Sequence, residues 1–333
     1  MTKIRIFLLI SALLAGAAVA GAQGHRHGGI VISEVNAEQV LTASRLHDQV
    51  EFLSHPSVGG RSTATPGSQR IKWWLAASFR AQGLVPLGDS WFHPFRTVSG
   101  RVGHNVAGIL PGSGSNRKYV IVMAHFDNLG TLDGTFYPGA DANASGVAAM
   151  LAVSEMFARM KEVGKSYSKS LIFVGLDAKE QGLGGARALW DSIREDRLTD
   201  PSTGSPIGRD DISMVVNLDQ LGSTDAPVHR GRPDYLIMLS DPSDGNRSTL
   251  VAANRGTGLD LGFDYYGSRD FTNLFYRSIS DQRPFLEAGV PAVMFTSGIT
   301  MNNNKPYDKC STLDFDVLRS RVLVIFKYIA KLL

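Results

Sequence analysis

The stretch YVIVMAHFD, at residues 119–127, closes an apolar run with a histidine and an aspartate. Its first six residues show no polar alternation, which is typical of a strand buried on both faces. Four later runs share this pattern, at 171–176, 212–218, 235–239 and 291–295. Strands of this kind usually form parallel sheets, because helices must then cover both faces.

Helical patterns separate these runs. In residues 68–82 the apolar side chains of Ile71, Trp74, Leu75 and Phe79 fall on one helical face, and Gly83 is placed to end the helix. Further helices are expected at 36–55, 145–159, 183–194, 248–254 and 316–331. The sequence therefore predicts one α/β domain over 36–333, with a mostly parallel central sheet and helices on both faces.

The N-terminus has the layout of a secretory signal peptide. Lys3 and Arg5 precede an apolar run at 6–20, and the small residues Ala20 and Ala22 follow. We expect residues 1–22 to be the signal peptide and the Gly- and His-rich residues 23–35 to be a flexible arm. The protein would then be exported to the periplasm or the extracellular space, without a membrane span.

The composition excludes little but sets useful limits. Of the 333 residues, 43% are hydrophobic and 20% are charged, which is ordinary for a globular protein. The formal charge is only +3 and is dispersed, so we expect no nucleic-acid partner. Cys310 is the single cysteine, so stability must come from core burial rather than from an intrachain disulfide.

Polar residues follow three of the predicted strands. His125 and Asp127 follow the first, Glu180 lies just after the second, and Asp219 follows the third. The carboxyl ends of parallel strands meet at one edge of a sheet, and an imidazole with carboxylates is the ligand chemistry of zinc. In this arrangement the Asp127 carboxylate is a candidate acceptor for the imidazole N–H of His125.

Eight motifs in order resemble the co-catalytic zinc aminopeptidases, family 28 of the metallopeptidases, whose relatives include glutamate carboxypeptidase and glutaminyl cyclase. The resemblance runs from about residue 50 to the C-terminus. The motifs are VEFLSHPSVGGRSTATPGSQ (50–69), HNVAGILPGS (104–113), VIVMAHFDNLG (120–130), PGADANASGVAAML (138–151), IFVGLDAKEQGLGG (172–185), VVNLDQLG (215–222), SDQRPFLEAGVPAVMF (280–295) and NKPYD (304–308).

The resemblance implies two zinc ions held by five side chains, with a glutamate as general base toward a metal-bound water. Three ligand positions are matched by His125, Glu180 and Asp219, and Asp141 matches the first aspartate of the family loop GADDNASG. Three other positions are substituted. The bridging aspartate is replaced by Ala142, the general base by Lys179 and the last histidine by Asn304.

These substitutions predict weak metal binding. One zinc would keep only His125 and Asp219 and the other only Glu180, whereas catalytic zinc usually has about three protein ligands. The Lys179 ammonium could replace the missing positive charge by forming an ion pair with Glu180 or Asp219. No confident catalytic residue remains, because Lys179 cannot accept a proton at neutral pH.

Several functions stay open on this basis. The first is an exported pseudopeptidase with a peptide or small-molecule ligand in its cleft, near residues 280–283 and 296–304. The alternative is an active metallo-aminopeptidase with one metal, held for example by His125, Asp219 and Asp141. A glutaminyl-cyclase-like acyltransferase ranks lowest, because only Glu180 of its ligand set is present. For Asp141 itself, capping of the following helix is an explanation without any metal.

Overall fold

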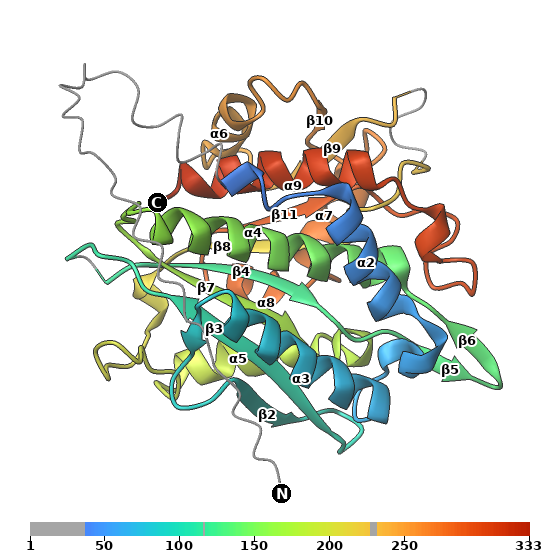
Figure 1. Cartoon of the computed structure of the whole chain (residues 1–333), viewed down its shortest axis with the longest axis horizontal. Coiled ribbons are helices and arrows are strands. Elements are labelled where there is room, and N and C mark those ends of the chain that lie inside the picture. The colour runs from blue at the N-terminus through green and yellow to red at the C-terminus, as the bar shows by residue number, and fades with distance from the viewer. Residues whose placement is uncertain (1–36, 116, 227–231) are drawn as a thin grey trace, which may run out of the picture.

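The computed structural model describes residues 37–115, 117–226 and 232–333 (Figure 1). The predicted signal peptide and arm lie outside these residues. The described part is organised around one nine-stranded sheet with the order β1-β3-β7-β4-β8-β11-β9-β10, in which β2 also pairs with β3. Its strands are β1 (Val85–Pro86), β2 (Phe92–Arg96), β3 (Val102–Leu110), β4 (Tyr119–His125), β7 (Ser170–Leu176), β8 (Ile212–Leu218), β9 (Tyr235–Leu239), β10 (Asp260–Gly262) and β11 (Ala292–Thr296).

The sheet is parallel at its centre and antiparallel toward its sides. The neighbours β7, β4, β8 and β11 all run in the same direction. On one side β3 is antiparallel to β7, and on the other β9 is antiparallel to β11. The predicted α/β fold with a central sheet is thus confirmed, and its parallel part comprises the central strands. A small hairpin of β5 (Gly130–Leu132) and β6 (Thr135–Tyr137) forms a separate sheet.

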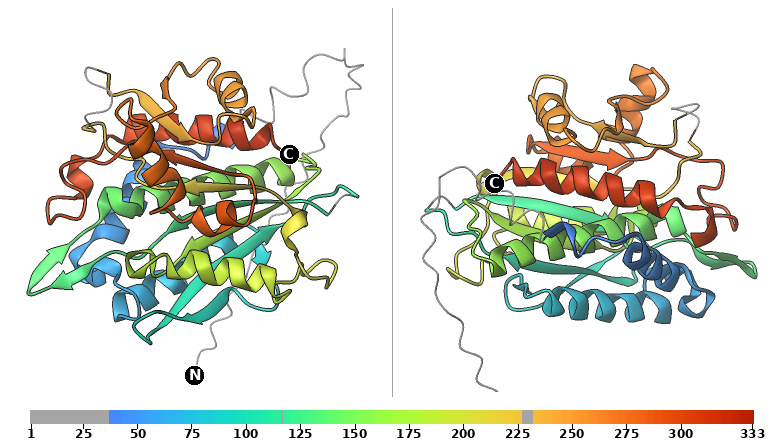
Figure 2. Two further views of the ribbon diagram at one scale, coloured as in Figure 1. Left: turned by 180° about the vertical axis from the view of Figure 1, so that it is seen from behind. Right: turned by 45° about the horizontal axis from the view of Figure 1, so that its top comes forward.

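Helices cover both faces of the sheet, as predicted (Figure 2). One core cluster joins the sheet to α2 (Ala43–Ser54), α3 (Pro66–Ala81), α4 (Gly146–Glu162) and α9 (Phe315–Ala330). The other cluster joins it to α5 (Gly184–Arg194) and α8 (Arg283–Glu287). Helix α6 (Asn246–Ala253) also joins the first cluster, through Leu250 and Ala253, and α7 (Arg269–Arg277) packs Tyr276 against β9 in a third cluster.

The central strand β4 shows why its sequence lacks polar alternation. Val120 and Val122 belong to the first core cluster, whereas Ile121 and Met123 belong to the second. Successive side chains of a strand point to opposite faces, so a strand with helices on both sides needs apolar residues at every position. The pattern in the sequence therefore reported burial correctly.

The helix predicted at 36–55 is shorter in the structure. It begins after Thr42, whose hydroxyl accepts a hydrogen bond from the N–H of Arg45, so Thr42 is the N-cap of α2. In the part of the chain that the structure describes, no helix has both the length and the apolar character needed to cross a bilayer.

Candidate functional site

The candidate site lies at the carboxyl ends of β7, β4 and β8. In the register of β4 and β8, Met123 is paired with Asn217, so His125 and Asp219 lie two residues further along at the same level. The Nε2 atom of His125 is 3.4 Å from Oδ1 of Asp219, and both side chains are buried. The sequence prediction that these strand ends meet is confirmed for this pair.

The ring of His125 also contacts Asp127, but not through the predicted atom. Nδ1 of His125 lies 3.1 Å from the main-chain oxygen of Asp127 and 3.6 Å from its Oδ1. The Asp127 carboxylate instead accepts hydrogen bonds from the N–H groups of Lys179 and Glu180, at 2.9 and 3.0 Å. Asp127 therefore fastens the turn after β7 to the end of β4.

Protonation of His125 depends on its neighbours. Burial and the charge of Lys179 act to lower the pKa of His125, but the adjacent carboxylates raise it to about 10. The ring is therefore positively charged at neutral pH. Conversely, burial acts to raise the pKa of Asp219, but the charges of Lys179 and His125 hold it below its usual value.

Lys179 and Glu180 lie on a short 3-10 turn, Lys179–Gln181, that follows β7. Nζ of Lys179 is 2.9 Å from Oε1 of Glu180, and the two side chains are 18% and 19% exposed. Burial acts to lower the pKa of the ammonium, but the carboxylates around it, chiefly Asp219 and Glu180, raise it above its ordinary value. The ion pair expected between Lys179 and Glu180 or Asp219 is thus present with Glu180.

A cavity of about 240 Å³ brings together several of the predicted residues. Lys179, Glu180, Asp219 and Asn304 all line it. Its other walls are partly apolar and partly amide-bearing, and they come from segments far apart in the sequence: Gln220, Tyr265, Phe275, Ile279, Ser280, Met294, Ile299 and Asn303. The prediction that 280–283 and 296–304 contribute to a pocket beside the site therefore agrees with this cavity.

Asp141 lies with its carboxylate directed elsewhere. Its Oδ1 accepts hydrogen bonds from the N–H of Gly222 at 2.8 Å and from the hydroxyl of Ser145 at 3.1 Å. The explanation of Asp141 as a helix cap is therefore wrong. Its carboxylate accepts from the loop after β8 and from Ser145 rather than from an N–H group at the start of α4. The N–H of Gly146, at the start of α4, is bound by Asn143 Oδ1 at 3.1 Å.

Ala142 is held in place by a residue that sequence reasoning did not single out. The Asp308 carboxylate accepts hydrogen bonds from the N–H groups of Asp141 and Ala142, at 2.7 and 3.0 Å. Asn143 Nδ2 contacts the main-chain oxygen of His125 at 3.3 Å, which brings this loop beside the end of β4. Asp308 closes the motif NKPYD, and that motif was the only available signal for its importance.

Asp281 is a second residue that was missed. It is fully buried, and within the part of the chain that the structure describes neither carboxylate oxygen has a hydrogen-bond partner. Burial raises its pKa to about 7, and the charges of His125, Asp219 and Lys179 also act on it. The available signal was an acidic residue in SDQRPF, just before the last predicted buried strand.

The donor atoms of the site do not form a ready cage for an ion. Over residues 37–115, 117–226 and 232–333, no three His, Cys, Asp or Glu side chains gather closely enough to hold a metal. His125 Nε2 and Asp219 Oδ1 are buried and make no hydrogen bond to any residue that the structure describes. The side chains that do meet form two oppositely charged pairs, His125 with Asp219 and Lys179 with Glu180.

Comparison with known proteins gives the family context. The model of peptidase family M28 matches residues 105–329. A probable zinc metalloprotease of Pyrenophora tritici-repentis is 22% identical over 329 residues, which cover 86% of this chain and 71% of that protein. The chain spans 62% and 63% of the lengths of two other curated relatives.

Solved structures of different activities share the fold. The aminopeptidase LapA of Legionella pneumophila superimposes with a TM-score of 0.69 at 15% identity, over 94% of this chain and 78% of that one. A glutaminyl cyclase of Macrostomum lignano superimposes with a TM-score of 0.66 at 18% identity, over 95% and 96%. At such identities the likeness establishes the fold alone, so the activity must be argued from the side chains.

Proposed function

Because this chain belongs to peptidase family M28, we propose that it is an exported pseudopeptidase whose zinc site has been converted into a buried charge network. It keeps a cleft beside that network for a peptide or small-molecule ligand and has weak or no peptidase activity. The observation that carries the proposal is the ion pair of Lys179 with Glu180, at 2.9 Å.

The residues present fit a pair of zinc ions poorly. An ammonium beside Glu180 and Asp219 supplies the positive charge that a cation would supply, and it repels a nearby dication. Ala142 and Asn304 stand where the resemblance places a bridging carboxylate and an imidazole. A methyl group has no donor atom, and a carboxamide oxygen is a weaker zinc ligand than imidazole.

Loss of the general base also argues against efficient hydrolysis. The position that the resemblance assigns to the base is Lys179, whose raised pKa keeps the side chain protonated at neutral pH. A protonated amine cannot remove a proton from water. The buried carboxylate of Asp281 has no hydrogen-bond partner among the described residues, but it does not line the cavity that Lys179 lines.

The cleft supports ligand binding without catalysis. Apolar side chains such as Phe275 and Met294 line the same cavity as the polar groups of Gln220, Asn303 and Asn304. Apolar walls with a few convergent polar groups are typical of small-ligand sites. The Asn303 side chain lines this cavity, and its Oδ1 has no hydrogen-bond partner among the described residues, so a small rotation of the side chain would let it accept from an amide N–H of a peptide.

Zinc content measured together with turnover tests the proposal. After dialysis against zinc-containing and then zinc-free buffer, we expect far less than one equivalent of zinc and no chelator-sensitive hydrolysis of amino-acid p-nitroanilides. About one tightly bound equivalent with chelator-sensitive turnover would overturn it. Titration with short peptides checks the cleft separately, and Ile279→Arg is the variant expected to fill the cavity and abolish binding.

The alternative is an active aminopeptidase that uses a single metal. One observation favours it: among the described residues His125 Nε2 and Asp219 Oδ1 have no hydrogen-bond partner and lie 3.4 Å apart, so a metal that displaces the ring proton would have two ligand atoms side by side. In that case Asp219→Ala would remove both the bound metal and the turnover. If a metal is bound and survives this substitution, it lies elsewhere and does not support the alternative.

A further inference from the structure

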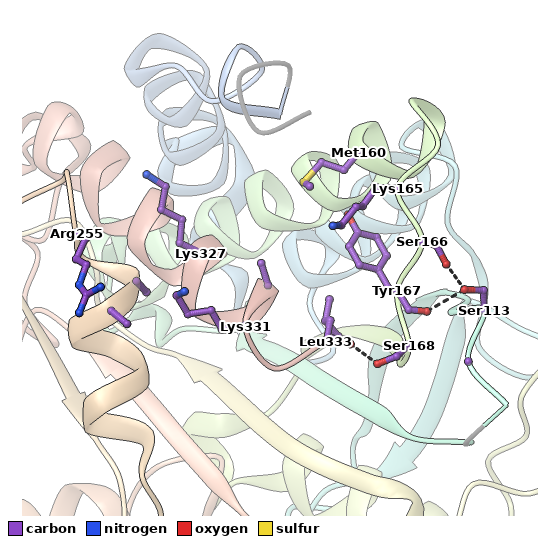
Figure 3. A pocket seen from close by; sticks show the side chains of 14 residues that line it. Ser113, Met160, Lys165, Ser166, Tyr167, Ser168, Arg255, Lys327, Lys331 and Leu333 are labelled. Atoms are coloured by element: carbon purple, nitrogen blue, oxygen red, sulfur yellow. Dashed lines mark hydrogen bonds between the residues drawn. The ribbon is translucent and has the colours of Figure 1, made fainter. Parts of the chain in front are cut away.

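A second cavity, of about 710 Å³, lies at the opposite ends of the central strands from the candidate site (Figure 3). It is lined by Ser113, which precedes β4, and by residues 166–168, which precede β7. The ends of α9 and α6 complete it. The cavity therefore borders the amino ends of β4 and β7, whereas the candidate site lies at their carboxyl ends.

Positive charge dominates this cavity. Its lining includes the cationic side chains of Lys165, Arg255, Lys327 and Lys331, and no Asp or Glu of the described residues. The terminal residue Leu333 also lines it, and its main-chain oxygen accepts a hydrogen bond from Ser168. Four cationic side chains thus line one cavity, and among the described residues no acidic side chain lines it with them.

Most of this charge is not neutralised by ion pairs. Lys327 is 3.5 Å from a carboxylate oxygen of Glu38. Considering only 37–115, 117–226 and 232–333, the side chains of Lys165, Arg255 and Lys331 form no ion pair. Unpaired cations close together repel one another, and an anionic ligand relieves that repulsion.

Two further lysines follow lining residues in the sequence and add positive charge, Lys161 after Met160 and Lys169 after Ser168. Lys161 Nζ donates to the main-chain oxygen of Pro111 at 2.6 Å, and Lys169 Nζ donates to the main-chain oxygen of Leu332. A neutral carbonyl satisfies the donor but does not cancel its charge. Because the whole chain carries a formal charge of only +3, this concentration of cations at one edge is a local feature.

The cavity also offers neutral contacts. Ser113 and Ser166 contribute hydroxyl groups that now hydrogen-bond to each other, while Met160 and Tyr167 provide apolar surface. In Figure 3, Lys327 and Lys331 lie between Arg255 on one side and Lys165 with the serines on the other. The cations come from three separate segments, after α4, after α6 and at the end of α9, so a ligand with several anionic groups can contact more of them than a ligand with one.

We propose that this cavity binds a ligand with two or more phosphate groups. An arginine and several lysines are a typical phosphate-binding set, in which Arg255 offers a planar fork and the lysines offer mobile point charges. The volume is within the range of small-molecule sites. An organic polyphosphate and a phosphorylated lipid headgroup share this chemistry. The proposal does not depend on the function of the candidate site, which lies at the opposite ends of the central strands.

Titration of the full chain with tripolyphosphate, followed by calorimetry, tests the proposal. We expect saturable binding that weakens as salt increases. The variant Lys165→Glu/Lys331→Glu should weaken it by about tenfold or more, because two charge-assisted contacts are lost. The matched control is Arg101→Glu/Arg269→Glu, which changes the net charge equally at exposed arginines outside the lining. It should change the dissociation constant by less than about twofold.

A second arm distinguishes the two sources of phosphate. Co-sedimentation with vesicles that contain cardiolipin, a lipid whose headgroup carries two phosphate groups, compared with phosphatidylcholine alone, detects a headgroup ligand. Tripolyphosphate binding without vesicle binding identifies a soluble ligand, and binding in both arms identifies a membrane headgroup. If the double variant does not fold, Arg255→Ala replaces it. The proposal is overturned if neither tripolyphosphate nor the vesicles bind saturably. It is also overturned if the double variant and the arginine control lose affinity equally.

Discussion

Nζ of Lys179 lies 2.9 Å from Oε1 of Glu180, and Asp219 lines the same small cavity. The two side chains are consecutive on a short turn and are only 18% and 19% exposed, and other charged groups lie nearby. Fully exposed ion pairs contribute little to stability, whereas a buried charge that loses its partner costs several kcal/mol. The positive charge of Lys179 is therefore needed to balance the buried negative charge of the site.

Replacing the ammonium tests this dependence. Lys179→Met should lower the free energy of unfolding by about 3 kcal/mol, because Glu180 loses its cationic partner and Asp219 keeps only the charge of His125. Adding Glu180→Gln should restore part of the loss, so the double-mutant cycle gives a coupling above about 1 kcal/mol. Urea denaturation measures both. The exposed pair Arg283–Glu287, at 2.7 Å, is the control, with an expected coupling below about 0.5 kcal/mol. Equal couplings for the two pairs would contradict the assignment.

Restoring the family pattern should restore metal binding. The triple variant Ala142→Asp, Lys179→Glu, Asn304→His adds a carboxylate, a base and an imidazole, which completes the ligand number expected of zinc sites. We expect zinc retained after dialysis, measured by atomic spectroscopy, and a raised melting temperature in its presence. The same triple variant with His125→Ala serves as the control and should retain less zinc. A folded triple variant without bound metal would show that the residue correspondence is wrong.

The buried carboxylate of Asp281 should make stability depend on pH. Its pKa is raised from 3.8 to about 7, so the folded state holds a proton that the unfolded state releases. The folded state therefore loses stability as pH rises from about 4 to 7. The variant Asp281→Asn has no carboxylate to titrate here, so it does not lose stability in this way. The free energy of unfolding of the variant minus that of wild type should therefore rise by about 3 kcal/mol between pH 4 and 7 and stay level above pH 7. Denaturation at several pH values measures the difference. Asp210→Asn, at a carboxylate whose side chain is 89% exposed, should show no such trend.

Asp308 should control the order of the loop that carries Ala142. Asp308→Ala removes the acceptor of two main-chain N–H groups and leaves both buried donors unpaired, which should cost about 2–3 kcal/mol. Hydrogen exchange at the amides of Asp141 and Ala142 should become faster, while exchange within β4 changes little. In the control Asp241→Ala, an exposed carboxylate is lost and the exchange at 141 and 142 should be unchanged. Unchanged protection in Asp308→Ala would contradict this role.

The sequence predicted the centre of the fold well because burial on both faces leaves a local pattern. The runs at 119–124, 171–176 and 212–218 correspond to β4, β7 and β8 within one residue at each end. β3 was not predicted as a strand, although its motif was noted. It contains Gly103, His104 and Asn105 and is antiparallel to both β2 and β7, so it is defined by pairing with a neighbouring and a distant strand rather than by its own pattern.

The candidate site was predicted where it depends on strand ends and missed where it depends on long-range contacts. The proximity of His125 and Asp219 follows from the order of the parallel strands. The direction of the Asp141 carboxylate does not, because its partners Gly222 and Ser223 are some eighty residues away in the sequence. Arg61 was missed for the same reason. It is fully buried and donates to the carbonyl oxygens of Leu53, Phe126, Pro138 and Gly139.

A bound metal ion and a lysine ammonium both place positive charge in a site, but only the metal ion can dissociate from it. An ion is exchanged with the surroundings, so its occupancy follows dilution, chelators and competing metals. The charge of Lys179 is covalently attached to the turn that it stabilises, and it has no dissociation constant. Its contribution is therefore delivered with every copy of the chain, whatever the trace-metal content of the medium in which that copy folds.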